Sequence, residues 1–243
     1  ILSEALERIP SATEAGGALA VLSGGLDSTV SLRLAVERYG AANVVAVSFF
    51  YGQKQKVELE RAAESCRRLG VEHSVIDLSF MAAINKGFSA NVDTAMDMPT
   101  IKDVIGDPAP VTYVANRNMI MMSIASAIAE TKGLSVVICG LQSNDNYNYH
   151  DTTPVWLGKL NSLLDENRKT GIKVIAPFVD LSKVEEIRAV VELDGNLDLF
   201  ASTLTCYNPD ESGASCGACP SCAERLQAFA ALNLIDPIAY QLD

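Results

Sequence analysis

The stretch Leu19-Ala20-Val21-Leu22-Ser23-Gly24-Gly25-Leu26-Asp27-Ser28-Thr29 decides the fold of this chain. Its first four residues are apolar and predict a buried parallel strand, and residues 30–39 have helical spacing. Residues 23–29, the phosphate loop, therefore form a strand-to-helix turn. Its two glycines let the backbone come close to a ligand, and the free N–H groups of the first helical turn attract an anion. We expect this loop to bind phosphate.

The residues around the two glycines indicate which class of phosphate-binding loop this is. No Gly-Lys-Ser or Gly-Lys-Thr follows, so the loop is not a Walker A loop. Ser-Gly-Gly-x-Asp-Ser-Thr resembles the pyrophosphate-binding loop of the N-type ATP pyrophosphatases (the PP-loop class), which includes NAD, GMP and asparagine synthetases. The resemblance implies an adenine-nucleotide alpha-hydrolase-like, Rossmann-like fold and a reaction that makes an adenylate and releases pyrophosphate. The implied ATP-binding residues are Ser23, Gly24, Gly25, Leu26, Asp27, Ser28 and Thr29.

Apolar runs and helical patterns alternate along the chain and predict an α/β protein with a parallel sheet flanked by helices. Expected strands cover 44–49, 74–78, 136–139 and 174–178; expected helices cover 57–69, 119–130 and 155–169, and another begins near 181. Ser182 and Glu185 have the spacing of a capping box at the start of that last helix. Residues 80–110 are rich in Gly, Asn, Asp and Pro, which predicts a long lid, a binding loop or a disordered segment.

Two cations and one polar segment are candidates for ligand binding. Arg117 begins an apolar helix, where a guanidinium needs an anion. Lys183 lies in the first turn of a helix and opposes the helix dipole, so a nearby phosphate explains it better than helix stability does. The segment 141–154 follows the strand 136–139 and is rich in Asn, Asp and Tyr. This composition suits a flat heterocycle that forms many hydrogen bonds.

Charge and hydropathy exclude several classes of protein. The 243 residues contain 19 basic and 30 acidic side chains, for a net charge of −11, so we expect neither direct nucleic-acid binding nor an anionic-membrane surface. No apolar run is long enough to span a bilayer, and the first residues do not resemble a signal peptide. We expect a cytoplasmic enzyme that acts on a small molecule or a protein segment.

Four of the six cysteines cluster in a C-x9-C-x2-C-x2-C array, formed by Cys206, Cys216, Cys219 and Cys222. An iron–sulfur cluster or redox-active thiols could use similar spacings. We favour a structural zinc ion, because four cysteines complete a closed tetrahedral site. We therefore expect two parts, an ATP-binding α/β domain over 18–200 and a zinc-binding element over 201–243.

Five motifs, in this order, resemble those of the 7-cyano-7-deazaguanine synthase family over 18–225. They are the phosphate loop, Tyr51-Gly52-Gln53-Lys54, Arg117-Asn118, Gly140 through Asp151, and Thr203 through Cys222. The resemblance implies that ATP, with Mg²⁺, adenylylates the carboxylate of 7-carboxy-7-deazaguanine. Ammonia then gives the amide, and a second adenylylation gives the nitrile. The implied catalytic residues are Asp27, Ser28, Arg117 and Lys183; the implied substrate-binding residues are Tyr51, Gln53, Asp145, Tyr149 and Asp151. The family often forms homodimers, which implies one here.

The substrate-facing motifs depart from the family pattern. Tyr149-His150-Asp151-Thr152 stands where the pattern has Tyr-Pro-Asp-Cys, and Ala115-Asn116 replaces Pro-Gly before Arg117; Ser143 and Gln55 differ as well. Such changes suit a relative that stops at the amide and joins the deazaguanine to another amine, such as a protein N-terminus in an antiviral system. A non-catalytic zinc interaction module and a tRNA thiolase are further alternatives.

Overall fold

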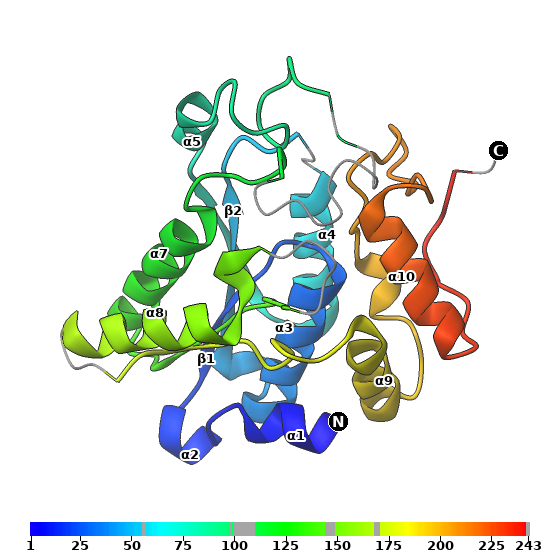
Figure 1. Cartoon of the computed structure of the whole chain (residues 1–243). Coiled ribbons are helices and arrows are strands. Elements are labelled where there is room, and N and C mark those ends of the chain that lie inside the picture. Colours follow the sequence, from blue (N-terminus) through cyan, green and yellow to red (C-terminus); the bar gives the residue numbers. More distant parts are fainter. Residues whose placement is uncertain (55–56, 98, 100–109, 144–148, 168–170, 242–243) are drawn as a thin grey trace.

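The computed structural model describes residues 1–54, 57–97, 99, 110–143, 149–167 and 171–241. Five parallel strands form one sheet in the order β3-β2-β1-β4-β5 (Figure 1). The strands are β1 (Ala18–Val21), β2 (Val44–Phe50), β3 (Glu72–Asp77), β4 (Val136–Ile138) and β5 (Lys173–Ile175). The order changes direction at β1, which lies between β2 and β4. Ligands of open parallel sheets bind at such a point, beyond the carboxyl ends of the strands.

Helices connect the strands and extend the chain at both ends. The α-helices are α1 (Leu2–Glu7), α2 (Ala12–Ala15), α3 (Leu26–Tyr39), α4 (Val57–Leu69), α5 (Phe80–Ile84), α7 (Arg117–Thr131), α8 (Pro154–Asn167), α9 (Lys183–Asp194) and α10 (Pro220–Ala231). Short 3-10 turns are η1 (Ala41–Asn43), η2 (His150–Thr152) and η3 (Phe200–Ser202). The predicted parallel α/β architecture with flanking helices is confirmed.

The two faces of the sheet are buried against different helices. Alternate side chains of a strand point to opposite faces, so Ala18 and Ala20 of β1 lie in one core and Leu19 lies in the other. The first core also contains apolar residues of α3, α4, α9 and α10. The second contains residues of α7 and α8, among them Met122 and Leu160. Figure 1 shows α7 and α8 on the opposite side of the sheet from α9 and α10.

Several element boundaries differ from the sequence-based expectation. The helix after the phosphate loop begins at Leu26, four residues earlier than the apolar spacing indicated, so Asp27 lies in its first turn. The fifth strand ends at Ile175, two residues before Pro177, which has no N–H to donate to a neighbouring strand. The expected loop at 80–110 starts with the short helix α5. The capping box of Ser182 and Glu185 is confirmed, because each side chain accepts the other residue's N–H.

Buried polar contacts join the C-terminal segment to the rest of the protein. Arg225 of α10 has no exposed surface; its guanidinium donates to both carboxylate oxygens of Asp236, at 2.7 and 2.9 Å, and to Thr203 Oγ1 at 2.6 Å. The backbone N–H of Leu204 donates to the carbonyl of Gly24 at 2.9 Å. The segment that carries the four clustered cysteines is therefore bonded directly to the phosphate loop.

Among the residues that the structure describes, no helix combines the length and the hydrophobicity needed to cross a bilayer.

Candidate active site at the carboxyl ends of β1 and β4

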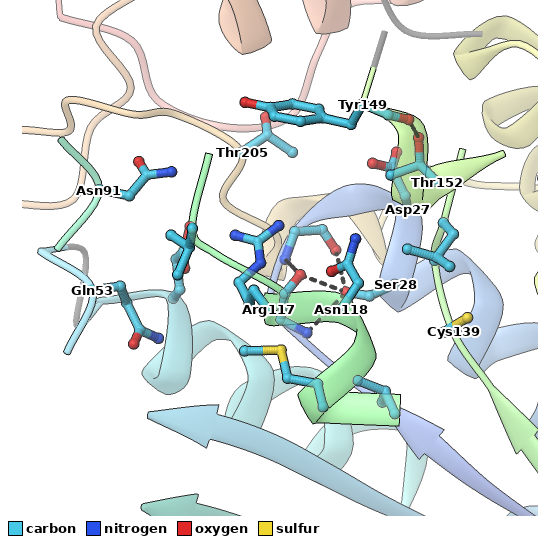
Figure 2. Close-up of a pocket in the computed structure, with 18 of the residues that line it drawn as sticks. Asp27, Ser28, Gln53, Asn91, Arg117, Asn118, Cys139, Tyr149, Thr152 and Thr205 are labelled. Carbon is cyan, nitrogen blue, oxygen red and sulfur yellow. Dashed lines mark hydrogen bonds between the residues drawn. The ribbon is translucent and has the colours of Figure 1, made fainter. Parts of the chain in front are cut away.

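A cavity of about 310 Å³ opens beyond the carboxyl ends of β1, β2 and β4. Segments far apart in the sequence line it, because the parallel sheet brings all three strand ends to the same edge. Figure 2 shows side chains from these segments pointing toward one another. The described lining residues that the sequence singled out include Ser23, Gly25, Asp27, Ser28, Tyr51, Gln53, Arg117, Gly140, Tyr149, Asp151 and Lys183.

Hydrogen bonds within the phosphate loop hold its hydroxyls toward the cavity. Ser28 Oγ accepts the N–H of Ser23 at 3.1 Å and lies 2.9 Å from Ser23 Oγ, which in turn accepts the N–H of Gly25 at 3.2 Å. Leu26 is fully buried in the core, and the Thr29 hydroxyl donates to the carbonyl of Gly25 at 2.8 Å. The cavity-facing groups of the loop are thus the serine side chains, Asp27 and backbone amides, which suit an anion.

Two glycines permit the close packing of the loop. A Cβ on Gly24, whose φ is +89°, would lie 2.1 Å from the carbonyl oxygen of Glu58 at the start of α4. A Cβ on Gly140, which follows β4, would lie 2.4 Å from the backbone nitrogen of Ser28. These contacts are backbone contacts that a side-chain rotation cannot relieve. The loop is therefore packed between α4 and the end of β4.

We expect Gly140→Ala to weaken both ATP binding and folding, because the new methyl group would displace the first turn of α3. Overpacking of this kind costs about 1–3 kcal/mol of unfolding free energy. Gly158→Ala is the matched control: it lies in α8 with no heavy atom within 4 Å of its new Cβ. We expect that variant to be as stable as the original or more so. Urea denaturation and ATP titration would check both variants, and equal behaviour would contradict the packing argument.

Asp27 and Lys183 form the main ion pair of the site. Lys183 Nζ donates to Asp27 Oδ1 and lies 3.7 Å from a carboxylate oxygen of Glu224. Burial by itself would raise the pKa of Asp27, but Lys183 holds that pKa below its ordinary value. Burial and the adjacent Asp27 raise the pKa of Glu186 well above normal. The charge of Lys183 thus favours the ionised form of Asp27, burial and Asp27 disfavour the ionised form of Glu186, and the predicted phosphate-binding lysine has a carboxylate as its counter-ion.

Arg117 is the first residue of α7 and points into the cavity (Figure 2). Its guanidinium donates to the Tyr51 hydroxyl at 3.2 Å and lies 5.6 Å from the centre of that ring. Although burial disfavours its charge, Tyr51 and Asp151 raise the pKa of Arg117 above its ordinary value. The neighbouring Gln53 accepts the N–H of Tyr51 at 2.8 Å and donates to the Phe49 carbonyl at 3.2 Å. Gln53 thus shapes the turn after β2 that presents Tyr51.

The segment after β4 supplies another wall of the cavity. Tyr149 stacks on Tyr113 with ring centres 6.5 Å apart, and the hydroxyl groups of Tyr149 and Thr112 lie 2.6 Å apart. Burial raises the pKa of Asp151, whose backbone carbonyl accepts the Asn118 amide at 3.4 Å. Asp145 lies outside the described residues.

The four clustered cysteines are brought together as the spacing predicted. The sulfur atoms of Cys206, Cys216, Cys219 and Cys222 all lie within 4.8 Å of one another. Backbone N–H groups of Cys216 and Asn208 donate to the Cys206 sulfur at 3.2 and 3.3 Å, and the Cys219 N–H donates to Cys216 at 3.2 Å. Such bonds stabilise thiolates. Four thiolates at this separation fit a tetrahedral Zn²⁺.

Sequence reasoning missed several lining residues. Glu58 lies on α4, where the spacing predicted only an amphipathic helix, and Glu224 lies on α10, a helix that was not predicted. Asn91 and Thr205 lie in irregular segments. Thr205 Oγ1 is buried and has no hydrogen-bond partner among the described residues. The only signal for Glu224 was its position two residues after Cys222, which places it on the helix that begins at the cysteine cluster.

The sheet order and the Ser-Gly-Gly-x-Asp loop at the end of β1 define an α/β protein of the PP-loop class. The family model of queuosine biosynthesis protein QueC matches residues 17–233. The chain therefore belongs to the QueC family, and the predictions of this family and of an enzyme of the ATP-dependent ligase class are confirmed.

Known proteins of this family resemble the chain over nearly its whole length. The 7-cyano-7-deazaguanine synthase of Marinomonas sp. (strain MWYL1) is 37% identical over 224 residues, covering 92% of this chain and 98% of that protein. The enzyme of the same name from Chromohalobacter salexigens is 38% identical over 239 residues, covering 97% and 90%. The structure of the U34-tRNA thiolase NcsA from Methanococcus maripaludis, with its 4Fe-4S cluster, matches all of this chain and 83% of its own at 15% identity and a TM-score of 0.50. That likeness shows the fold alone.

Proposed function

We propose that this chain is a 7-cyano-7-deazaguanine synthase. It would adenylylate the carboxylate of 7-carboxy-7-deazaguanine, form the amide with ammonia, and convert the amide to the nitrile after a second adenylylation. The observation that carries this proposal is the match to enzymes of that name over at least nine-tenths of both chains. It is supported by the cavity in which the phosphate loop, Arg117 and Lys183 meet.

The phosphate loop would bind ATP through its pyrophosphate half. Ser23, Ser28 and the loop amides would hold the leaving pyrophosphate, and Arg117 and Lys183 would offset the charge that develops on it. The Asp27 carboxylate is an oxygen ligand of the kind Mg²⁺ prefers, and it faces the cavity with the serine hydroxyls. The Mg²⁺ ion would screen the negative charge of the triphosphate. As ATP binds, its phosphates would compete with Asp27 for Lys183.

The second substrate would lie against the walls formed by the turn after β2 and the segment after β4. Tyr51 and Tyr149 offer aromatic surface and hydroxyl groups, and Asp151 offers an acceptor for the N–H groups of the deazaguanine. Gln53 would act through the turn that it closes, and Asp145 completes the set predicted from the sequence. The four-cysteine site would hold a structural Zn²⁺ that fixes the start of α10.

Mass spectrometry of products tests the proposal. The protein is incubated with ATP, Mg²⁺, 7-carboxy-7-deazaguanine and ammonium, and AMP is quantified beside the deazaguanine products. We expect the nitrile, with two AMP formed per nitrile. Amide as the end product, or an adenylate that waits for another amine, would point to the conjugating alternative. Absence of any AMP would refute both the synthase and the conjugating alternative. Binding of tRNA would favour a thiolase. The homodimer and the cytoplasmic location stay predictions.

A further inference from the structure

If the function proposed above is right, nitrile formation requires the removal of protons from the substrate as well as the transfer of an adenylyl group. When the amide oxygen bonds to the α-phosphorus and pyrophosphate leaves, the amide nitrogen loses one proton. When the C–O bond then breaks and AMP leaves, the nitrogen loses its second proton, and that electron pair becomes the third C–N bond. No oxidant or reductant is needed. The protein must instead offer a base close to the phosphate loop.

Most ionisable groups of the cavity are already engaged. Asp27 and Glu224 lie beside Lys183, and Lys54 donates to the Met96 carbonyl at 2.6 Å. Arg117 stays charged, and burial raises the pKa of its partner Tyr51, so neither accepts a proton readily. Asp151 is assigned to the heterocycle in the proposed function. Among the described residues that line the cavity, one carboxyl is left, that of Glu58.

Glu58 lies in the first turn of α4, where the phosphate loop packs against the helix. Its carbonyl oxygen would touch a Cβ on Gly24, so helix and loop are in backbone contact at this residue. Within the described part of the chain, the Glu58 carboxyl has no hydrogen bond and no ion pair. An unengaged carboxyl beside the loop that holds the reacting phosphate is free to take a proton from a bound substrate.

We propose that the Glu58 carboxylate accepts the protons that leave the substrate nitrogen as the amide becomes the nitrile. Protons would pass from this carboxyl to solvent between the two steps, because one carboxylate holds one proton at a time. The same base would serve attack by ammonia, since the nitrogen that adds to the acyl adenylate must also lose a proton. The first adenylylation needs no base, because its nucleophile is already a carboxylate.

The electrostatic surroundings of Glu58 suit this role. Burial raises its pKa to about 7, and Arg117 opposes the rise. A base with a pKa near the working pH combines a usable ionised fraction with a useful basicity. In the part of the chain that the structure describes, the other charged and titratable groups that face the cavity are Asp27, Tyr51, Lys54, Arg117, Tyr113, Cys139, Tyr149, Asp151, Lys183, Tyr207 and Glu224. Below about pH 7 Glu58 is protonated and cannot act, so nitrile formation should slow as the pH falls.

The test separates the proton step from adenylylation. Starting from the deazaguanine carboxamide with saturating ATP and Mg²⁺, kcat for nitrile formation is measured on both sides of pH 7. For the unaltered protein, we expect kcat to fall about tenfold per pH unit below the Glu58 pKa. In Glu58→Gln, we expect kcat to drop by about 10²–10⁴-fold and the inflection to disappear. Carboxylate-dependent ATP–pyrophosphate exchange should change by less than about threefold, because no proton is transferred there.

Two further variants test whether the effect of Glu58→Gln on nitrile formation is only structural. Glu60→Gln alters an exposed carboxyl on the same helix and should leave both reactions unchanged. Glu58→Asp keeps the acid and should restore part of the rate and the pH inflection. The inference would be overturned if Glu58→Gln kept the pH inflection of kcat, or if it lost ATP–pyrophosphate exchange as much as nitrile formation. It would also be overturned if the unaltered protein catalysed the exchange but made no nitrile. Absence of carboxylate-dependent exchange in the unaltered protein would instead refute the proposed function itself, and the inference with it.

Discussion

Asp27→Asn is expected to reduce ATP-dependent turnover at least about 10³-fold, a loss typical of removing one group that organises charge at a reacting centre. Asp27 is the anion that faces Lys183 and the oxygen ligand that would hold Mg²⁺. The amide fills the same space but carries no charge, so it neither orients the lysine nor binds the metal well. ATP–pyrophosphate exchange and AMP release measure the loss.

The folded state should survive this substitution. Lys183 is 7% exposed, and a buried lysine without a counter-ion would cost several kcal/mol. Glu186 lies beside it with a raised pKa that partly reflects repulsion from Asp27. Removal of the Asp27 charge lowers that pKa, so Glu186 can ionise and become the counter-ion. We therefore expect the cysteine site to keep its metal and unfolding to remain cooperative.

Asp180→Asn is a suitable control for Asp27→Asn. Asp180 is a half-exposed carboxylate that pairs with Arg8 away from the cavity. Its loss should cost at most about 1 kcal/mol of unfolding free energy and no turnover. Full activity in Asp27→Asn would remove the phosphate loop aspartate from the mechanism.

Cys219→Ser is expected to abolish metal binding and to unfold the C-terminal segment. Structural zinc sites contribute about 10–16 kcal/mol of apparent binding free energy, and that energy is available to folding. Cys219 is also the N-cap residue of α10, and Cys222 lies in the first turn of that helix. We expect metal content to fall from one zinc per chain to none and the unfolding temperature to drop sharply.

The same substitution should reduce activity, because α10 carries residues of the active site. Ser221 and Glu224 of this helix line the cavity, and the next residue, Arg225, anchors the helix through Asp236. Elemental analysis, thermal unfolding and AMP release would be compared with Cys66→Ala, which alters a buried cysteine that is not part of the cluster. A stable, active protein without metal would contradict the structural role. Iron in place of zinc in the unaltered protein would contradict the choice of metal.

The sequence alone determined those features of this protein that depend only on residues close together in the chain. An apolar run followed by Ser-Gly-Gly-x-Asp-Ser-Thr predicts a strand and a phosphate-binding turn, because only glycine permits the close backbone contact found at Gly24. The capping box of Ser182 and Glu185 and the four-cysteine array are likewise short-range patterns. The helix α5 was missed because one exposed turn of five residues has almost no periodic signal.

Tertiary structure alone decided how distant side chains meet. The sheet order β3-β2-β1-β4-β5 brings residues separated by more than a hundred positions to one edge, so that Lys183 reaches Asp27. The packing of α9 beside α10 brings Glu224 to the same lysine. The residues next to Glu58 in the sequence do not distinguish it from Glu60, which lies exposed on the same helix. The packing of α4 against the phosphate loop makes Glu58 a half-buried acid with a raised pKa, and Arg117 opposes that rise. The sequence determined which chemical groups the protein has, and the crossover connections of the parallel sheet decided which of them share one cavity.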